Sequence, residues 1–300
     1  MLAGGLALLN RALLLDDLPP TLPGATHDWT WRGWRVRYTT LGEGPPIVLI
    51  HGVHAAASTF EMDKIFEPLA RGHTVYALDL IGFGKSERPA AAYSGELYAD
   101  LVGDFLAEVV REPAIVLGSS LGAAYAVAAA GQRPELVRAL ILISPTGQTG
   151  LGFGGRGFGA LLGLPLIGSA AFNGLVSRPS IRRYLENVYA DTALVDDSLI
   201  DQHWAVSHQP NARLALAAFI SGQLDLPFER SEGRVRAPIL AIRGDHPGLA
   251  PVTPDAAFAT LGGAVGSRRI DGTGQLPHQE APDRVVELIE TWLASSVDAR

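Results

Sequence analysis

"AIVLGSSLGAAYAVAAA", residues 114–130, places a continuous apolar run before a glycine-bounded serine and an alanine-rich run after it. The first run predicts a buried strand and the second a helix. Between them, residues 118–122 (GSSLG) have the G-x-S-x-G spacing of a strand-to-helix turn that is too tight for side chains at its ends. Such a turn lifts the Ser120 hydroxyl clear of the sheet and directs the Leu121 amide to the same place. Ser120 is therefore the candidate nucleophile.

Apolar runs recur on both sides of this turn and alternate with helical patterns. Several runs are continuous, which is typical of strands buried on both faces. The alternation predicts a mostly parallel sheet with helices on both sides, preceded by a hairpin at residues 29–38. The predicted strands are residues 47–50, 74–80, 114–119, 139–144, 238–243 and 267–270, and the predicted helices are residues 59–70, 96–110, 121–132, 254–261 and 282–294.

This rhythm breaks between residues 145 and 237. A glycine-dense stretch, TGQTGLGFGGRGFGALLG, predicts a flexible segment, and helix-like stretches follow it. Loops at the carboxyl ends of parallel strands normally build the binding site, so we interpret the insertion as a lid. Its many Leu, Ala, Phe and Gly residues favour an apolar ligand. The predicted parts are an N-terminal extension (1–25), a core (26–144 and 231–300) and a helical lid or cap (145–230).

Several motifs occur in the order of one known family. They are "HG" at 51–52, "DLIGFGKSERP" at 79–89, "GSSLG" at 118–122, "RPELVRALILISP" at 133–145 and "LPHQEAPDRVVELIETWL" at 276–293. With them the chain resembles the α/β-hydrolase superfamily over roughly residues 28–145 and 232–296. The resemblance implies an α/β fold with an eight-stranded, mostly parallel sheet and a variable cap. It also implies Ser-acid-His chemistry on esters, amides, epoxides or related small molecules, with the amides of Val53 and Leu121 as the oxyanion hole.

Two positions depart from this resemblance. It predicts an acid where the chain has Pro247, and a histidine directly after Gly274, where the chain has Gln275. A glutamine amide cannot accept the proton of serine at neutral pH, and proline offers no side-chain acceptor. In a serine protease, loss of the histidine lowers turnover by about 10⁶-fold. Ser120 therefore needs another base to act as a nucleophile.

Several substitutes for that base are open. His278 follows Gln275 by three residues and can face Ser120 with Asp245 or His246 nearby, because triads are defined by geometry and not by position. This gives the candidate catalytic set Ser120, His278 and Asp245. Alternatively, Ser120 and Gln275 hold and polarise a carbonyl while a group of the substrate transfers the proton.

A lid histidine, His203 or His208, is the remaining substitute. The leading hypothesis is a hydrolase-like enzyme with a displaced or non-standard triad, acting on an apolar carboxylic ester or related carbonyl compound. One alternative is a non-catalytic protein that binds a small apolar ligand in a hydrolase-like pocket. The other is a non-hydrolytic enzyme that activates a carbonyl.

Composition narrows the partners and cofactors. The chain has 24 Lys and Arg against 31 Asp and Glu, a net charge of −7, and no long basic run, which argues against nucleic-acid binding. It contains no cysteine, which excludes disulfides and thiolate metal sites and is compatible with a reducing, cytoplasmic location. His51-x-x-His54 lacks a third ligand at a recognised spacing, and residues 82–86 lack phosphate-loop spacing. We therefore expect neither metal nor cofactor.

The amino-terminal stretch MLAGGLALLNRALLLDDLPP has an apolar run interrupted by Asn10 and Arg11 and ended by Asp16 and Asp17. The run is too short and too broken to span a bilayer. It also lacks the cationic start and cleavage site of a signal peptide. We expect a helix packed on the body or a mobile terminus, with contact to a membrane interface as the alternative.

Overall fold

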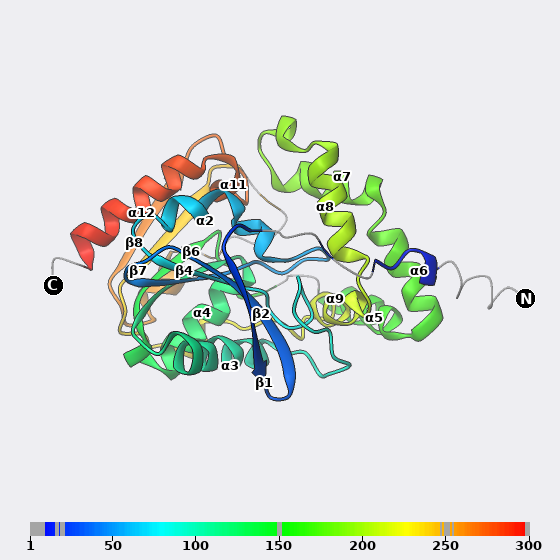
Figure 1. Ribbon diagram of the computed structural model, residues 1–300, viewed down its shortest axis with the longest axis horizontal. Helices are drawn as coiled ribbons and strands as arrows, with labels where there is room; N and C mark the ends of the chain where they lie inside the picture. Colours follow the sequence, from blue (N-terminus) through cyan, green and yellow to red (C-terminus); the bar gives the residue numbers. More distant parts are fainter. Residues whose placement is uncertain are drawn as a thin grey trace, which may run out of the picture.

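The computed structural model describes residues 10–15, 18, 22–148, 152–246, 248, 253 and 255–297. Its strands are β1 (Ala25–Trp31), β2 (Trp34–Leu41), β3 (Pro46–Ile50), β4 (Thr74–Leu78), β5 (Ala114–Ser119), β6 (Val137–Ile143), β7 (Ile239–Gly244) and β8 (Val265–Ile270). They form one eight-stranded sheet in the order β1-β2-β4-β3-β5-β6-β7-β8 (Figure 1). Only the pairings of β2 are antiparallel. The predicted mostly parallel sheet is confirmed.

Helices cover both faces of this sheet. They are α2 (Asp63–Leu69) and α12 (Pro282–Ser296) on one face, and α3 (Gly95–Phe105) and α4 (Leu121–Gln132) on the other (Figure 1). Every residue of β3 and β5 is buried. Successive side chains of a strand point to opposite faces, so Ile47 packs toward α2 and α12 whereas Val48 packs toward α3 and α4. The continuous apolar runs exist because both faces are covered.

The chain between β6 and β7 forms a set of helices gathered at one end of the molecule (Figure 1). They are α5 (Gly152–Gly163), α6 (Pro165–Leu175), α7 (Arg178–Val188), α8 (Asp197–Ser207) and α9 (Ala212–Ile220). Residues 152–163 of the glycine-dense stretch that we expected to be flexible form α5, and residues 149–151 lie outside the described residues. A Cβ on Gly159 would lie 2.6 Å from the Ala217 carbonyl oxygen of α9. Glycine therefore lets α5 lie directly against α9, and tertiary packing overrides its low helix propensity.

Short elements complete the chain. They are η1 (Thr59–Met62), the π-helical η2 (Leu106–Val110), η3 (Pro134–Leu136), η4 (Thr192–Leu194), η5 (Phe228–Ser231), α10 (Ala256–Ala259) and α11 (Pro277–Glu280). Two of them flank the candidate site. η1 follows the loop after β3, and α11 follows the loop after β8. Both loops lie at the carboxyl end of a parallel strand, where ligands bind in sheets of this kind.

The described part of the N-terminal extension packs on the inserted helices. The Leu15 amide donates to the His208 carbonyl (2.9 Å), and the Asn173 side-chain amide donates to Asn10 (2.8 Å). Leu18 is buried with Ala56 and Val206. The rest of this extension, residues 1–9, 16–17 and 19–21, lies outside the described residues.

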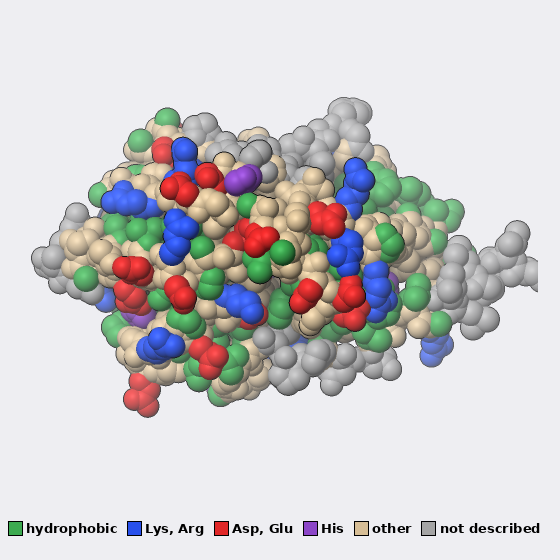
Figure 2. Space-filling model, turned by 90° about the horizontal axis from the view of Figure 1, so that it is seen from above, with side chains coloured by type: hydrophobic (Ala, Val, Ile, Leu, Met, Phe, Trp, Pro, Cys, Tyr) green, Lys and Arg blue, Asp and Glu red, His purple; other side chains and the backbone are tan. Residues whose placement is uncertain are grey.

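The visible surface carries charges of both signs. Figure 2 shows Lys and Arg side chains interspersed with Asp and Glu over one face. Among the described residues, no single helix has the length and apolar character needed to cross a membrane. One bent pair, Gly155–Gly163 with Leu166–Leu175, meets those criteria when its two arms are taken together across an angle of 120°.

Candidate active site

The turn between β5 and α4 holds Ser120 in a rare backbone conformation, with φ 51° and ψ −123°. A Cβ on Gly118 would lie 2.6 Å from the Gly122 carbonyl oxygen, and one on Gly122 would lie 2.5 Å from the His51 carbonyl oxygen. Only glycine fits at both ends of this turn. The Ser120 amide donates to the Ile143 carbonyl (2.9 Å), which anchors the turn to β6. Such strain persists only where the surroundings hold it and is concentrated at functional sites.

Ser120 lines a cavity of about 320 Å³ beneath the inserted helices. The volume is at the lower end of the range for small-molecule sites. Its walls come from the loop after β3 and η1, from the segment after β6, from α4, α7, α8 and α9, and from the loop after β8. The apolar lining residues are Val53, Leu121, Leu185, Val188, Phe219 and Leu276, and the polar ones are His54, Glu61, Ser120, Thr146, Gln148, Tyr184, His203 and Gln275.

The loop after β3 brings Val53 to this cavity beside Leu121. Neither backbone amide donates a hydrogen bond to a residue that the structure describes. His51 is fully buried and supports the loop: its Nδ1–H donates to the Gly52 carbonyl (2.6 Å), and its Nε2 accepts from the Leu80 amide (3.1 Å). Both ring nitrogens are therefore engaged, and burial lowers the pKa of His51.

Gln275 stands where the histidine was expected, and it lines the same cavity as Ser120. Its backbone N–H donates to the Val188 carbonyl (2.8 Å), and this bond joins the loop after β8 to α7. Where the resemblance implies the base of a triad, the cavity thus has a side chain that cannot take a proton at neutral pH. Pro247, at the expected position of the acid, lies outside the described residues.

His278 does not line the cavity at Ser120. It is fully buried in α11, and neither of its ring nitrogens has a hydrogen-bond partner among the described residues. Its Nε2 lies 3.7 Å from Glu61 Oε1. Burial lowers the pKa of His278 to about 4, so the ring is neutral at pH 7.

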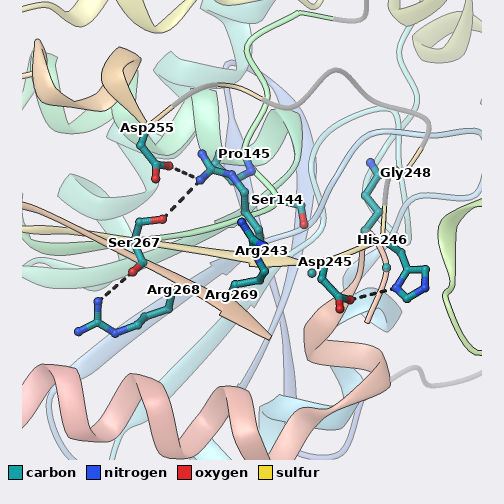
Figure 3. A pocket seen from close by; sticks show the side chains of 13 residues that line it. Ser144, Pro145, Arg243, Asp245, His246, Gly248, Asp255, Ser267, Arg268 and Arg269 are labelled. Carbon is teal, nitrogen blue, oxygen red and sulfur yellow. Dashed lines mark hydrogen bonds and ion pairs between the residues drawn. The ribbon is translucent and has the colours of Figure 1, made fainter. Parts of the chain in front are cut away.

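Asp245 and His246 line a second, larger cavity of about 840 Å³, together with Arg243 (Figure 3). The carboxylate of Asp245 accepts hydrogen bonds from the amides of Gly272 (2.9 Å) and Thr273 (3.2 Å) and from His246 Nδ1 (3.0 Å). The Gly272 bond is the largest cause of the lowered pKa of Asp245. The structure does not bring Asp245 or His246 to the cavity at Ser120. Gln275 lines both cavities.

The most unusual group at Ser120 is Glu61, which the sequence analysis did not consider. It is 8% exposed, and its two carboxylate oxygens lie 3.1 and 3.2 Å from the Gly52 amide nitrogen. Burial raises the pKa of Glu61 to about 7, against the lowering effects of the Ser119 hydroxyl and the Gly52 amide. One acid within a predicted helix gives no sequence signal of this kind, because its burial depends on the segments that surround it.

Two histidines accompany Glu61 in the cavity. His54 Nε2 lies 3.9 Å from Glu61 Oε2, and the His54 ring stacks on Tyr184 and on His203 with centroids 5.5 Å apart in each case. Burial holds the pKa of His54 well below its usual value and lowers that of His203 to about 4. His203, one of the two lid histidines weighed above, is therefore at the cavity. The other, His208, stacks on Trp204 and does not line it.

The acid and the histidines at Ser120 belong to the part of the chain that the structure describes. Within it, no group of three or more His, Cys, Asp or Glu side chains is arranged to hold a metal ion. The histidines and the acid at Ser120 instead contact one another or the backbone.

The sequence profile of the Alpha/beta hydrolase family matches residues 47–288. The chain belongs to this family. A 2-hydroxymuconate semialdehyde hydrolase of Pseudomonas sp. (strain CF600) is 31% identical over 204 residues, covering 67% of this chain and 68% of that protein. An uncharacterized protein of Mycobacterium tuberculosis is 29% identical over 313 residues, covering 97% and 86%. The proteins similar to this chain therefore include a named hydrolase.

Solved structures of the family share the fold. The meta-cleavage product hydrolase from Pseudomonas fluorescens IP01 has a TM-score of 0.73 at 21% identity, covering 90% of this chain and 98% of that one. The epoxide hydrolase CorEH has a TM-score of 0.75 at 21% identity, covering 90% of this chain and 99% of that one. At this identity the likeness establishes the fold alone, and it confirms the α/β-hydrolase fold expected from the motifs.

Proposed function

We propose that this chain is a serine hydrolase with a non-standard triad, acting on a small apolar ester or related carbonyl compound. Ser120 is the nucleophile, and the amides of Val53 and Leu121 stabilise the oxyanion. The single observation that carries the proposal is the backbone strain at Ser120, at the edge of a cavity that two uncommitted amides share. Preorganised amides aimed at a developing oxyanion supply a large part of the catalysis of acyl transfer.

The substrate class follows from the cavity. Leu185 and Val188 of α7, Phe219 of α9 and Leu276 give an apolar wall, and the volume of about 320 Å³ suits a small molecule or the short acyl part of a larger one. Two of the named relatives are 2-hydroxymuconate semialdehyde hydrolases, which supports the same reaction class. The inserted helices act as a lid in this proposal, because α7 and α9 contribute that wall.

Covalent labelling with a fluorophosphonate, and hydrolysis of p-nitrophenyl esters of increasing acyl length, test this proposal. We expect the wild-type protein to be labelled at Ser120 and to prefer short acyl chains. Ser120→Ala should abolish labelling and lower kcat/KM by at least about 10³-fold, because the nucleophile is lost. Turnover that survives Ser120→Ala would exclude serine chemistry.

One observation favours a second candidate, a binding protein without catalysis. Gln275 lines the cavity in place of the expected base. The glycines of the turn at residues 118–122 would persist for structural reasons even without catalysis. Such a protein would bind an apolar carbonyl compound in this cavity without labelling or turnover. A non-hydrolytic enzyme, in which Ser120 and Gln275 polarise a carbonyl, would instead consume a carbonyl substrate without releasing an acid.

A further inference from the structure

We propose that Glu61 is the general base for Ser120, in place of the missing histidine, and that His278 positions the Glu61 carboxylate. This inference rests on the proposed function. It assigns a base from η1, which follows the loop after β3, whereas the resemblance expects the base after β8. The observations that carry it are the approach of Glu61 to Ser120, the burial of its carboxylate, and the placing of an imidazole near each carboxylate oxygen.

Gly52 marks how closely the two side chains approach. A Cβ on Gly52 would lie 3.1 Å from Glu61 Oε2 and 3.3 Å from Ser120 Cβ. Glu61 and Ser120 thus flank the same point, from which a side chain is missing, and both line the same cavity. No hydrogen bond joins them directly here. Catalytic hydrogen bonds are often long without substrate, and a carboxylate can also act through one water.

The other basic groups of the cavity are less suited to the task. The Ala56 amide donates to His54 Nδ1 (3.3 Å), so the proton of the neutral ring is on Nε2, the atom that faces Glu61. His54 is therefore a donor toward Glu61 and has no lone pair to offer there. His203 Nδ1–H donates to the Leu199 carbonyl (2.9 Å), which leaves Nε2 as an acceptor, but burial lowers its pKa to about 4. A base works best when its pKa is near the working pH, and only Glu61, at about 7, meets that condition among these groups.

His278 explains how the carboxylate is held. The imidazole is fully buried, its ring nitrogens lack hydrogen-bond partners among the described residues, and its Nε2 lies 3.7 Å from Glu61 Oε1, whereas His54 lies near the other oxygen, Oε2. A buried polar group without a partner calls for a specific reason. A small approach lets Nε2–H donate to Glu61 when the carboxyl is ionised. His278 is thus a positioning residue that acts through Glu61.

The backbone around Glu61 is fixed at two points. The Thr59 amide donates to Asp79 Oδ1 (2.7 Å), and the Gln279 side-chain amide donates to the Glu61 carbonyl (2.7 Å). These bonds tie η1 to the loop after β4 and to α11. A catalytic group needs this kind of support, because a displacement of about 1 Å removes much of its effect.

The reaction balances without any further reagent. Glu61 takes the hydroxyl proton as Ser120 Oγ forms a bond to the carbonyl carbon, and the oxyanion accepts from the Val53 and Leu121 amides. When the tetrahedral intermediate collapses, the bond to the leaving alkoxide breaks and Glu61 returns the proton to it. Water then gives a proton to Glu61 and attacks the acyl carbon. Release of the acid returns the proton to Ser120.

The test measures kcat/KM for a p-nitrophenyl ester from pH 5 to pH 9. In the wild-type protein we expect the rate to rise with pH through about 7, as Glu61 ionises. The groups that face Glu61 are His54 and His278, and its charge also reaches the hydroxyls of Tyr184 and Tyr189. Glu61→Gln should lower kcat/KM by about 10²–10⁴-fold and remove the rise near pH 7.

Matched variants separate the outcomes. Glu67→Gln makes the same chemical change at an exposed position of α2 and should leave the profile unchanged. His278→Leu should move the rise to higher pH, because the carboxylate loses its donor, and His278→Gln should move it back. A melting curve checks folding. Should Glu61→Gln not fold, Glu61→Asp replaces it and is expected to keep the rise at a lower rate.

Each result decides one proposal. A Glu61→Gln enzyme with the wild-type rate and profile, beside an inactive Ser120→Ala, overturns the role of Glu61 and leaves the serine hydrolase standing. A Glu61→Asp profile without the rise likewise overturns it. A wild-type protein with neither labelling nor turnover overturns the proposed function, and the role of Glu61 falls with it.

Discussion

The two cavities on either side of Gln275 differ in what surrounds their charged groups. The larger one, near Asp245, has charged side chains that are paired, each pair with one partner more than half exposed: Asp245 bonds His246, and Arg243 bonds Asp255 (Figure 3). The smaller one, at Ser120, buries a carboxyl and several imidazoles within contact of one another.

This contrast teaches that volume is a poor guide to the chemistry. In the larger cavity the charged side chains form ion pairs, and the pKa of Asp245 shifts only toward its ionised form. In the smaller one burial raises the pKa of Glu61 to about 7. A group that changes its charge near neutral pH beside a strained serine is a better mark of a catalytic site than a larger opening.

The burial of Glu61 should be measurable in the stability of the protein. Its pKa is raised from 4.5 to about 7, so the folded protein keeps a proton on this group that the unfolded chain has released. The resulting stability is full below pH 4.5 and is lost as the pH rises through about 7, a change of about 3 kcal/mol. Urea denaturation should show wild-type stability falling relative to Glu61→Gln by about this amount from pH 5 to pH 8.

Comparison with the variant is needed because other groups titrate in the same range. His203 and His278 have pKa values lowered to about 4, so their contribution to stability is lost as the pH falls from 6.5 through 4. Both proteins share that loss. Parallel stability curves for wild type and Glu61→Gln would mean that Glu61 is solvated, and the contrast between the cavities would disappear.

A methyl group on Gly52 should separate Glu61 from Ser120. It would lie within 3.1–3.4 Å of both side chains, so we expect Gly52→Ala to lower kcat/KM roughly 10-fold and to destabilise the fold by about 1–2 kcal/mol. Gly72→Ala is the control, because a Cβ there meets nothing within 4 Å. Equal effects of the two substitutions on kcat/KM would contradict the close approach at Gly52.

Asp245→Asn should have the smallest effect on the reaction. The asparagine oxygen can still accept from the Gly272 and Thr273 amides, and the residue does not line the cavity at Ser120. We expect kcat/KM to change by less than about threefold. A fall of about 10²-fold or more would instead support the set Ser120, His278 and Asp245 and would connect the two cavities.

Much of the fold was predictable because the patterns involved are local. The strand at 114–119 and the helix at 121–132 have the predicted bounds. A continuous apolar run before the turn at residues 118–122 indicates the buried strand, and an alanine-rich run after it indicates the helix. The helix α5 was not predictable. Its glycines oppose a helix locally and fit only because α9 lies against them.

The site was predictable to a smaller degree. The motif marked Ser120, Val53 and Leu121, and all three line one cavity. The motif also marked Gln275 as a departure. It did not indicate which acid or imidazole of the chain acts as the base. His278 was predicted only because it is close to Gln275 in the sequence. Glu61 is far from that segment along the chain and meets it only through packing of η1 against α11.

The amino-acid sequence by itself determined the parallel sheet, the strained serine and the glutamine at the position where the resemblance expects a histidine, because each depends on residues a few positions apart. Only the tertiary structure decided which carboxyl stands beside that serine and which imidazoles surround it. The reason is physical: the proton affinity of a side chain depends on its desolvation and on its neighbours in space, and these come from segments that are distant in the sequence.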